Sequence, residues 1–146
     1  MHRGRRYSLT REKMKLQYAF RLYINNDAGE RVLGKGGAEI LEAISEYGSI
    51  VEAARKLGMS YKFVWDYLIR MQKRLNQPVV VTHRGGAGAG RKKGGGGTTL
   101  TPIAGALLRE FGSTERLIGN SLSSRNKILI RRFSHGSRSV LFFRAP

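Results

Sequence analysis

The sequence predicts an α+β fold that is mostly helical, and three observations support this. Apolar residues recur at helical spacing in three consecutive segments between residues 34 and 75. Segments rich in β-branched and aromatic residues precede and follow these helices. Serine and glycine stand where helices commonly begin and end. The chain has 146 residues, which suits one domain with appendages.

Residues 1–16 are predicted to form a basic flexible arm, because their charges are not accompanied by a group of apolar residues that would join a core. Farther along, aromatic and branched residues such as Phe20 and Leu22 alternate with other residues, which is typical of a strand. A short return strand at residues 31–33 would complete the pair. We therefore expect a β-hairpin at residues 17–33.

A first helix is predicted after the glycines at residues 34–37. Ile40, Leu41 and Ile44 recur at helical spacing, so they would share one buried face. Gly48 is placed to end this helix, because glycine readily adopts the left-handed conformation that terminates many helices.

A second, shorter helix is predicted between Ser49 and Gly58. Ser49 and Glu52 form the Ser-x-x-Glu pattern of a capping box, in which each side chain satisfies a backbone N–H group at the helix start. Ala53 and Ala54 supply a small apolar face, which lets another helix cross closely. Ser49 is also a candidate phosphate contact, although capping alone would explain the residue.

The third predicted helix covers residues 60–75, with Ser60 as its N-cap. Val64, Leu68 and Met71 lie at i, i+4 and i+7 and would pack inward. A short helix, a glycine-containing turn and a longer helix with a polar and aromatic start form the helix-turn-helix pattern.

A valine-rich strand, a glycine-rich loop and the returning strand "TTLT" follow. Thr101 and Pro102 then occupy the preferred cap and first-turn positions of a further helix, which is expected to break or bend at Gly112. This order of elements predicts a winged helix-turn-helix at residues 34–118.

Residues 119–146 are predicted to form a basic C-terminal tail that contains a second hairpin. The segments "KILIRRF" and "RSVLFF" would be its strands, and "SHGS" between them contains a glycine suited to a turn. Their apolar density predicts that the tail packs on the body or on a second copy of the chain.

The formal net charge is +17, from 27 basic and 10 acidic residues. Residues 34–77 contain seven basic and five acidic side chains, whereas residues 119–146 contain six basic and none acidic. The excess therefore surrounds the helical body and indicates a polyanionic partner. A basic amphipathic helix, which a membrane surface would favour, is not evident, so we expect double-stranded DNA and no membrane partner.

Enzyme function is not expected, and no catalytic residue, metal site or cofactor is predicted. The glycine-rich loop lacks the P-loop motif. His2, His83 and His135 lie far apart, and cysteine is absent. No apolar run reaches the roughly 18 residues of a spanning helix, and the basic start is no secretory signal, so we expect a cytoplasmic, nucleoid-associated protein.

Four basic residues are candidate phosphate contacts of the wing. Arg84 lies at the base of the glycine-rich loop, and Arg91, Lys92 and Lys93 lie within that loop. Glycines would let this loop follow a phosphate backbone without side-chain clashes. The alternative is a solvated loop. The arginines of the arm are either solubilising charge or minor-groove contacts.

Three segments, "LGKGGAEILEAI", "GSIVEAARKLGMSYKFVWDYLIRM" and "GGGGTTLTPIAGALL", carry a resemblance to a known family. They make residues 34–112 similar to the N-terminal DNA-binding domain of the molybdate-responsive ModE-type regulators, itself similar to the LysR-type winged helix. The resemblance implies a homodimer joined through the first and last helices. It also implies a recognition helix at about residues 60–75 in the major groove.

In that family the start of the third helix meets the DNA, which implies contacts from Ser60, Tyr61 and Lys62, with Trp65 and Asp66 one turn on. Lys62 and the positive end of the helix dipole would favour phosphate or base-edge acceptors. The alternative for Tyr61 and Lys62 is that they are ordinary exposed residues. Trp65 lies one residue off the buried stripe, and partial packing is favoured for it over DNA contact.

The resemblance also implies what the chain lacks. In the full-length regulators, molybdate is bound by C-terminal modules that open with a Ser-Ala-Arg-Asn motif, which Ser124–Asn126 resemble. Only 20 residues follow Asn126, too few to close such a barrel, so molybdate binding is not expected.

Two functions are consistent with these features. A transcription regulator of the ModE/LysR type is favoured by the residues of the third helix. An architectural nucleoid-associated protein, which binds DNA with low sequence specificity, is favoured by the high net charge. Of the two, we favour the regulator.

Overall fold

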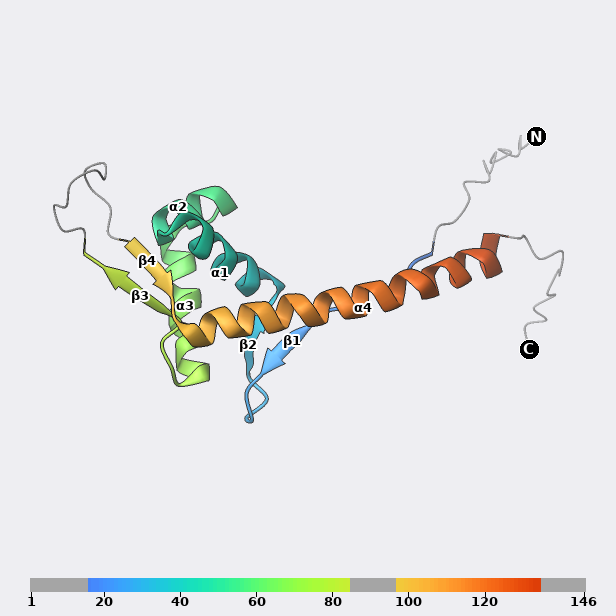
Figure 1. The fold of residues 1–146 in the computed structure, drawn as a ribbon, viewed down its shortest axis with the longest axis horizontal. Helices are drawn as coiled ribbons and strands as arrows, with labels where there is room; N and C mark the ends of the chain where they lie inside the picture. The colour runs from blue at the N-terminus through green and yellow to red at the C-terminus, as the bar shows by residue number, and fades with distance from the viewer. Residues whose placement is uncertain (1–15, 85–96, 135–146) are drawn as a thin grey trace, which may run out of the picture. The chain divides into compact units, whose positions relative to one another are not determined.

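The computed structural model describes residues 16–84 and 97–134 (Figure 1). The elements follow in this order: β1 (Tyr23–Asn25), β2 (Arg31–Gly34), α1 (Lys35–Tyr47), α2 (Ile50–Leu57), α3 (Tyr61–Leu75), β3 (Val80–His83), β4 (Gly97–Leu100) and α4 (Pro102–Ser134). The chain divides into two compact units, Phe20–Leu117 and a second unit that combines residues up to Ala19 with those from Ile118 onward. The predicted mostly helical α+β fold with a winged helix-turn-helix is confirmed.

The core of the unit Phe20–Leu117 forms where α1, α2 and α3 pack together. Its largest fully buried side chains are Leu33, Ile40, Leu41, Ile44, Val64, Leu68, Met71 and Val79. The apolar stripes predicted on the first and third helices are therefore confirmed. Ala53 and Ala54 of α2 are also buried, and their small side chains let the neighbouring helices approach. Full burial of one leucine or isoleucine contributes about 1.5–3 kcal/mol.

Left-handed residues end the first three helices. Gly48 closes α1 with φ 64°, and its N–H group donates to the carbonyl of Ile44. Gly58 closes α2 with φ 65°. Asn76 closes α3 with φ 53°, a conformation that asparagine tolerates better than most side chains. The predicted stops at the two glycines are confirmed.

The N-terminal hairpin is shorter than predicted. β1 pairs antiparallel with β2, with Tyr23 opposite Gly34 and Ile24 opposite Leu33. Residues 17–22 are not in a strand. The reason is that β2 ends at Gly34, where the chain turns directly into α1, so residues before Tyr23 have no partner strand.

The wing consists of β3 and β4, which pair antiparallel from Val80 opposite Leu100 to His83 opposite Gly97. Backbone hydrogen bonds tie its sheet to the end of α1 and continue the pairing of its two strands. Thr98 N–H donates to the carbonyl of Gly48 at 2.7 Å, and Thr101 N–H donates to that of Val79 at 3.0 Å. The first bond fixes β4 to the end of α1, and the second extends the β3–β4 ladder by one pair.

α4 is one continuous helix of 33 residues, so the break predicted at Gly112 is wrong. Its start matches the prediction: Pro102 is the first helical residue, and Ala104 N–H donates to Thr101 Oγ1 at 3.4 Å. A single glycine inside a helix costs only about 1 kcal/mol relative to alanine. Phe111, buried at 2% exposure beside Gly112, holds this part of the helix against the core.

The C-terminal hairpin predicted within residues 119–146 is also wrong in its first strand, because residues 127–133 are helical. Ile128 and Ile130 alternate as in a strand, but so short an apolar run fits a helix equally well. Arg131 and Arg132 lie in the last turn of α4, where positive charge complements the helix dipole. The second predicted strand lies outside the described residues. In the same unit, Tyr18 N–H donates to Asn126 Oδ1 at 2.7 Å.

Candidate nucleic-acid interface

The start of α3 projects its side chains into solvent. Ser60 is the N-cap, and its Oγ accepts a hydrogen bond from Phe63 N–H at 3.1 Å. Tyr61 and Phe63 are each 49% exposed, whereas Val64 on the inner face is fully buried. The buried stripe therefore fixes the rotation of α3 and turns its first residues outward, as a recognition helix requires.

Two side-chain pairs, each with i, i+4 spacing, cover this exposed surface. The rings of Tyr61 and Trp65 stack, with centroids 6.2 Å apart and planes 9° apart. Beside them, Lys62 Nζ lies 2.6 Å from Asp66 Oδ2 in an exposed ion pair. Such a pair contributes about 1 kcal/mol at most, so a phosphate or base edge can displace Asp66 readily.

Trp65 is 37% exposed, and the contact of its ring is with Tyr61. The sequence favoured partial packing of Trp65. The ring packs against Tyr61, another exposed residue of α3, and lies outside the core. Phe63 was not considered as a site residue from the sequence. Phe63 directly precedes the buried Val64, so the helical spacing of the buried residues places it off the inner face. Its exposure could therefore have been predicted from the sequence.

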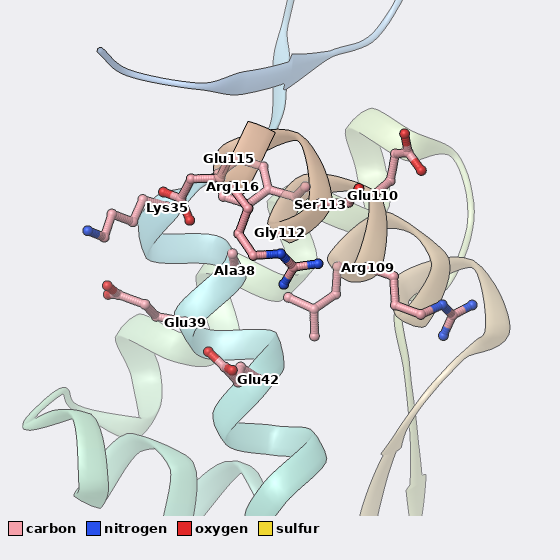
Figure 2. Close-up of a pocket in the computed structure, with 12 residues that line it drawn as sticks. Lys35, Ala38, Glu39, Glu42, Arg109, Glu110, Gly112, Ser113, Glu115 and Arg116 are labelled. Atoms are coloured by element: carbon pink, nitrogen blue, oxygen red, sulfur yellow. The ribbon is translucent and has the colours of Figure 1, made fainter. Parts of the chain in front are cut away.

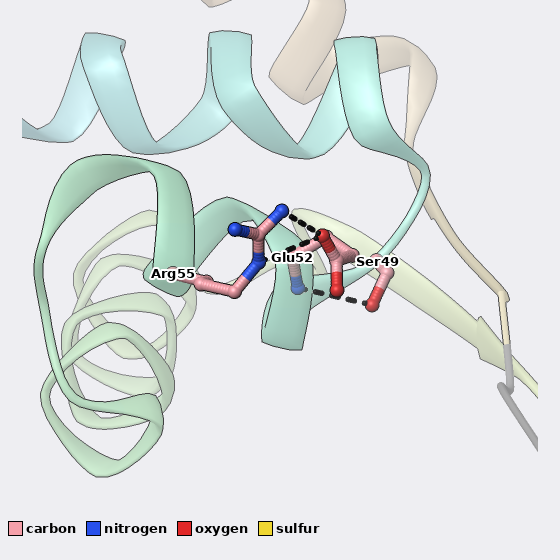
Figure 3. A network of polar contacts seen from close by, with 3 residues as sticks. All are labelled: Ser49, Glu52 and Arg55. Carbon is pink, nitrogen blue, oxygen red and sulfur yellow. Dashed lines mark hydrogen bonds and ion pairs between the residues drawn. The ribbon is translucent and has the colours of Figure 1, made fainter.

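Ser49 is half-buried and caps α2, with Glu52 N–H donating to its Oγ at 3.4 Å (Figure 3). The predicted capping box forms on this side alone. The Glu52 carboxylate instead accepts two hydrogen bonds from Arg55, at 3.1 and 2.9 Å. These bonds raise the pKa of the Arg55 guanidinium above its ordinary value. The negative charge of the Glu52 carboxylate disfavours a phosphate close to Ser49. The positive charge of Arg55, which is bonded to that carboxylate, opposes this effect.

The wing places one predicted contact within the described residues. Arg84 follows β3 directly and is exposed. Arg91, Lys92 and Lys93 lie outside the described residues. Figure 1 shows that the outer ends of β3 and β4 and the turn between α2 and α3 lie at the same, upper end of their unit. Because Thr98 N–H is bonded to the carbonyl of Gly48, the residue before Ser49, β4 of the wing lies next to the start of α2.

A second basic surface was not predicted from the sequence. Arg31, Arg70 and Arg74 line a hollow of about 130 Å³ where β2 meets α3. Arg31 lies over the ring of Tyr23 at 3.6 Å, and Arg74 donates to the carbonyl of Arg31 at 2.7 Å. Arg70 and Arg74 are four residues apart, so the sequence indicates that they share one face of α3. It does not indicate that the β1–β2 hairpin, which bears Arg31, packs against that face.

A groove of about 650 Å³ lies between α1 and the first half of α4 (Figure 2). It presents both signs of charge, with Glu39 and Glu42 on α1 facing the side that bears Arg109 and Arg116 on α4. Among the residues of the described ranges, no group of three His, Asp or Glu side chains is placed to hold a metal ion. No helix within those ranges is long and apolar enough to cross a bilayer.

Comparisons with known proteins agree with the resemblance carried by the sequence. Residues 37–104 match the family described as "Bacterial regulatory helix-turn-helix protein, lysR family". Molybdenum-pterin-binding protein MopB of Rhodobacter capsulatus is 41% identical over 103 residues, which cover 68% of this chain and 36% of that protein. Transcriptional regulator ModE of Haemophilus influenzae is 39% identical over 77 residues, covering 53% of this chain and 28% of that protein.

A solved structure, the complex of the CbnR DNA-binding domain with DNA, aligns with a TM-score of 0.44 and 20% identity, over 63% of this chain and 92% of that chain. The chain spans about a third of the length of the curated relatives it matches. The family match at residues 37–104 spans most of α1, all of α2 and α3, both strands of the wing and the first residues of α4.

Proposed function

We propose that this chain, whose residues 37–104 are a LysR-type helix-turn-helix domain, is a transcription regulator that binds double-stranded DNA. The observation that carries the proposal is the exposed start of α3 above a fully buried stripe. α3 would enter the major groove, where base edges offer distinguishable donors and acceptors. Ser60, Tyr61, Lys62 and Trp65 are the proposed contacts on that helix.

The wing would bind the phosphate backbone beside the groove. Arg84 would contact it at the base of the glycine-rich loop, and Arg91, Lys92 and Lys93 along the loop. Their contribution would be independent of sequence and would fall with salt, because each neutralised phosphate releases counterions. Ser49, at the start of α2, would lie against the same backbone. A regulator of this kind acts in the cytoplasm, on the nucleoid.

We further propose that the chain acts as a homodimer on a two-fold site. The groove between α1 and α4 supports this, because Glu39 and Glu42 line it from α1 and Arg109 and Arg116 line it from α4, and a second copy would present the same charges in reverse order. Sedimentation equilibrium tests the proposal directly. A single species of 16.3 kDa at micromolar concentration would contradict it.

The test of sequence-specific binding begins with selection of a preferred duplex from a random library. Its affinity is then compared with that of a scrambled duplex of equal composition, at two salt concentrations. A regulator should prefer the selected duplex by roughly 10³ or more. The architectural alternative, which the net charge of +17 suggests and the family match does not favour, predicts equal affinity and a steep salt slope.

A further inference from the structure

Three of the side chains exposed at the start of α3 are aromatic. Tyr61, Phe63 and Trp65 fall within five consecutive residues, and each leaves more than a third of its surface exposed. Tyr61 and Trp65 stack into one flat patch, whereas Phe63 lies roughly 200° around the helix from Tyr61. The apolar surface that can enter a groove is therefore the Tyr61–Trp65 pair.

Of the charged side chains next to this pair, one can donate a hydrogen bond to a base edge. Lys62 is the single cation on this surface between Ser60 and Asp66, and in the free chain it is paired with Asp66 at 2.6 Å. Asp66 is itself an acceptor, and its charge opposes close approach to phosphate. Arginine, which makes the commonest bidentate contact to guanine, is absent from residues 60–66.

In the major groove, the exposed apolar group of a base pair is the 5-methyl group of thymine. An exposed aromatic pair gains from the removal of its surface from water only where it meets another apolar group. A patch that presents two stacked rings to this groove therefore distinguishes thymine from the other bases by contact with its methyl group.

We propose that the stacked Tyr61–Trp65 pair determines specificity by contacting thymine methyl groups in the major groove. The inference rests on the proposed entry of α3 into that groove and adds the chemical feature that it reads. The preferred site contains thymines at the positions under this pair, and Lys62 leaves Asp66 for a phosphate or an acceptor next to them.

The experiment replaces thymine by uracil, which removes the 5-methyl group and keeps base pairing. A duplex is selected from a random library with the full chain and resynthesised with deoxyuridine at one thymidine at a time. Affinity is measured by fluorescence anisotropy. Uracil at a contacted position should weaken binding about fourfold, the equivalent of exposing one methyl group, and uracil elsewhere should have no effect.

Variants connect this effect to the two rings. Trp65→Ala and Tyr61→Ala should each weaken binding to the thymine duplex and bring the ratio of thymine to uracil affinities close to one. Phe63→Ala is the matched control, since it removes an equally exposed ring from another side of the same turn and should keep the ratio. Urea denaturation of each variant ensures that only folded protein is compared.

The outcomes separate this inference from the proposed function. A library that yields no preferred duplex overturns the proposed regulator, and the thymine inference with it. A preferred duplex whose affinity is unchanged by uracil at every position overturns the thymine inference alone. So does a thymine-to-uracil ratio that survives in both Trp65→Ala and Tyr61→Ala.

Discussion

The two faces of α3 differ in every physical property that bears on their roles. On the inner face, Val64, Leu68 and Met71 are 0–1% exposed and belong to the core. On the outer face, Tyr61 and Trp65 contact each other in solvent. The inner face therefore stabilises the fold, and the outer face is free to meet a partner. One helix of 15 residues separates stability from recognition by rotation about its axis alone.

The largest effect is expected from the inner face. Leu68→Ala should lower the free energy of unfolding by about 2–5 kcal/mol, because it removes fully buried apolar surface and leaves a cavity. Urea denaturation followed by circular dichroism measures this loss. The DNA affinity of the folded fraction should be unchanged. A loss below about 1 kcal/mol would mean that α3 is not packed as described.

The wing should affect the affinity for DNA without affecting the preference for one DNA sequence over another. Replacing Arg91, Lys92 and Lys93 with alanine should weaken binding to selected and scrambled duplexes alike, because phosphate contacts carry no sequence information. The slope of log affinity against log salt should become shallower by roughly 2 to 3, about 0.9 for each lost phosphate contact. Anisotropy titrations at several salt concentrations check both numbers. Unchanged slopes would remove the loop from the interface.

The outer face of α3 should affect binding to the selected duplex without affecting the stability of the fold. Lys62→Gln should weaken binding to the selected duplex by about tenfold, the scale of one good base or phosphate contact. Its unfolding free energy should stay within about 0.5 kcal/mol, because the ion pair with Asp66 is exposed. Lys73→Gln, in the last turn of the same helix, is the matched control and should bind as the parent does.

The smallest effect is expected at the start of α2, where capping and DNA contact can be distinguished. Ser49→Asp keeps an N-cap acceptor, so the unfolding free energy should change by less than about 0.5 kcal/mol. Its added negative charge should still weaken DNA binding several-fold if Ser49 lies against phosphate. Ser49→Ala should instead cost about 1 kcal/mol of stability or less, since the cap bond is long at 3.4 Å. Equal DNA affinity in Ser49→Asp would leave Ser49 with a capping role alone.

Local signals explain why much of this fold could be predicted from the sequence. The ends of α1 and α2 were predictable because Gly48 and Gly58 occupy left-handed positions that glycine adopts at no steric cost. The rotation of α3 was predictable because Val64 and Leu68 are four residues apart. The exposure of Tyr61 and Lys62 then follows without any tertiary information.

The errors have other causes. The strand predicted at residues 127–133 was an apolar run too short to distinguish from a helix, and the remaining errors depended on contacts between segments. The length of α4 could not be predicted because Gly112 breaks a helix only when nothing holds its neighbours, and here Phe111 packs into the core. The shortened β1 depends on where β2 ends. The hydrogen bond between Arg74 and the carbonyl of Arg31 joins residues 43 positions apart. Arg91, Lys92 and Lys93, outside the described residues, stay predictions.

The hydrogen bond from Thr98 to the carbonyl of Gly48 has a consequence for how such a protein can diversify. It joins two main-chain groups, so it does not depend on the hydroxyl of Thr98, although that side chain is buried and a larger one would have to displace its neighbours. Proline at position 98 would abolish the bond. β4 is therefore held at the end of α1 by an anchor that needs no particular side chain. Proteins with this fold can therefore change the phosphate contacts of the wing and the sequence preference of α3 separately.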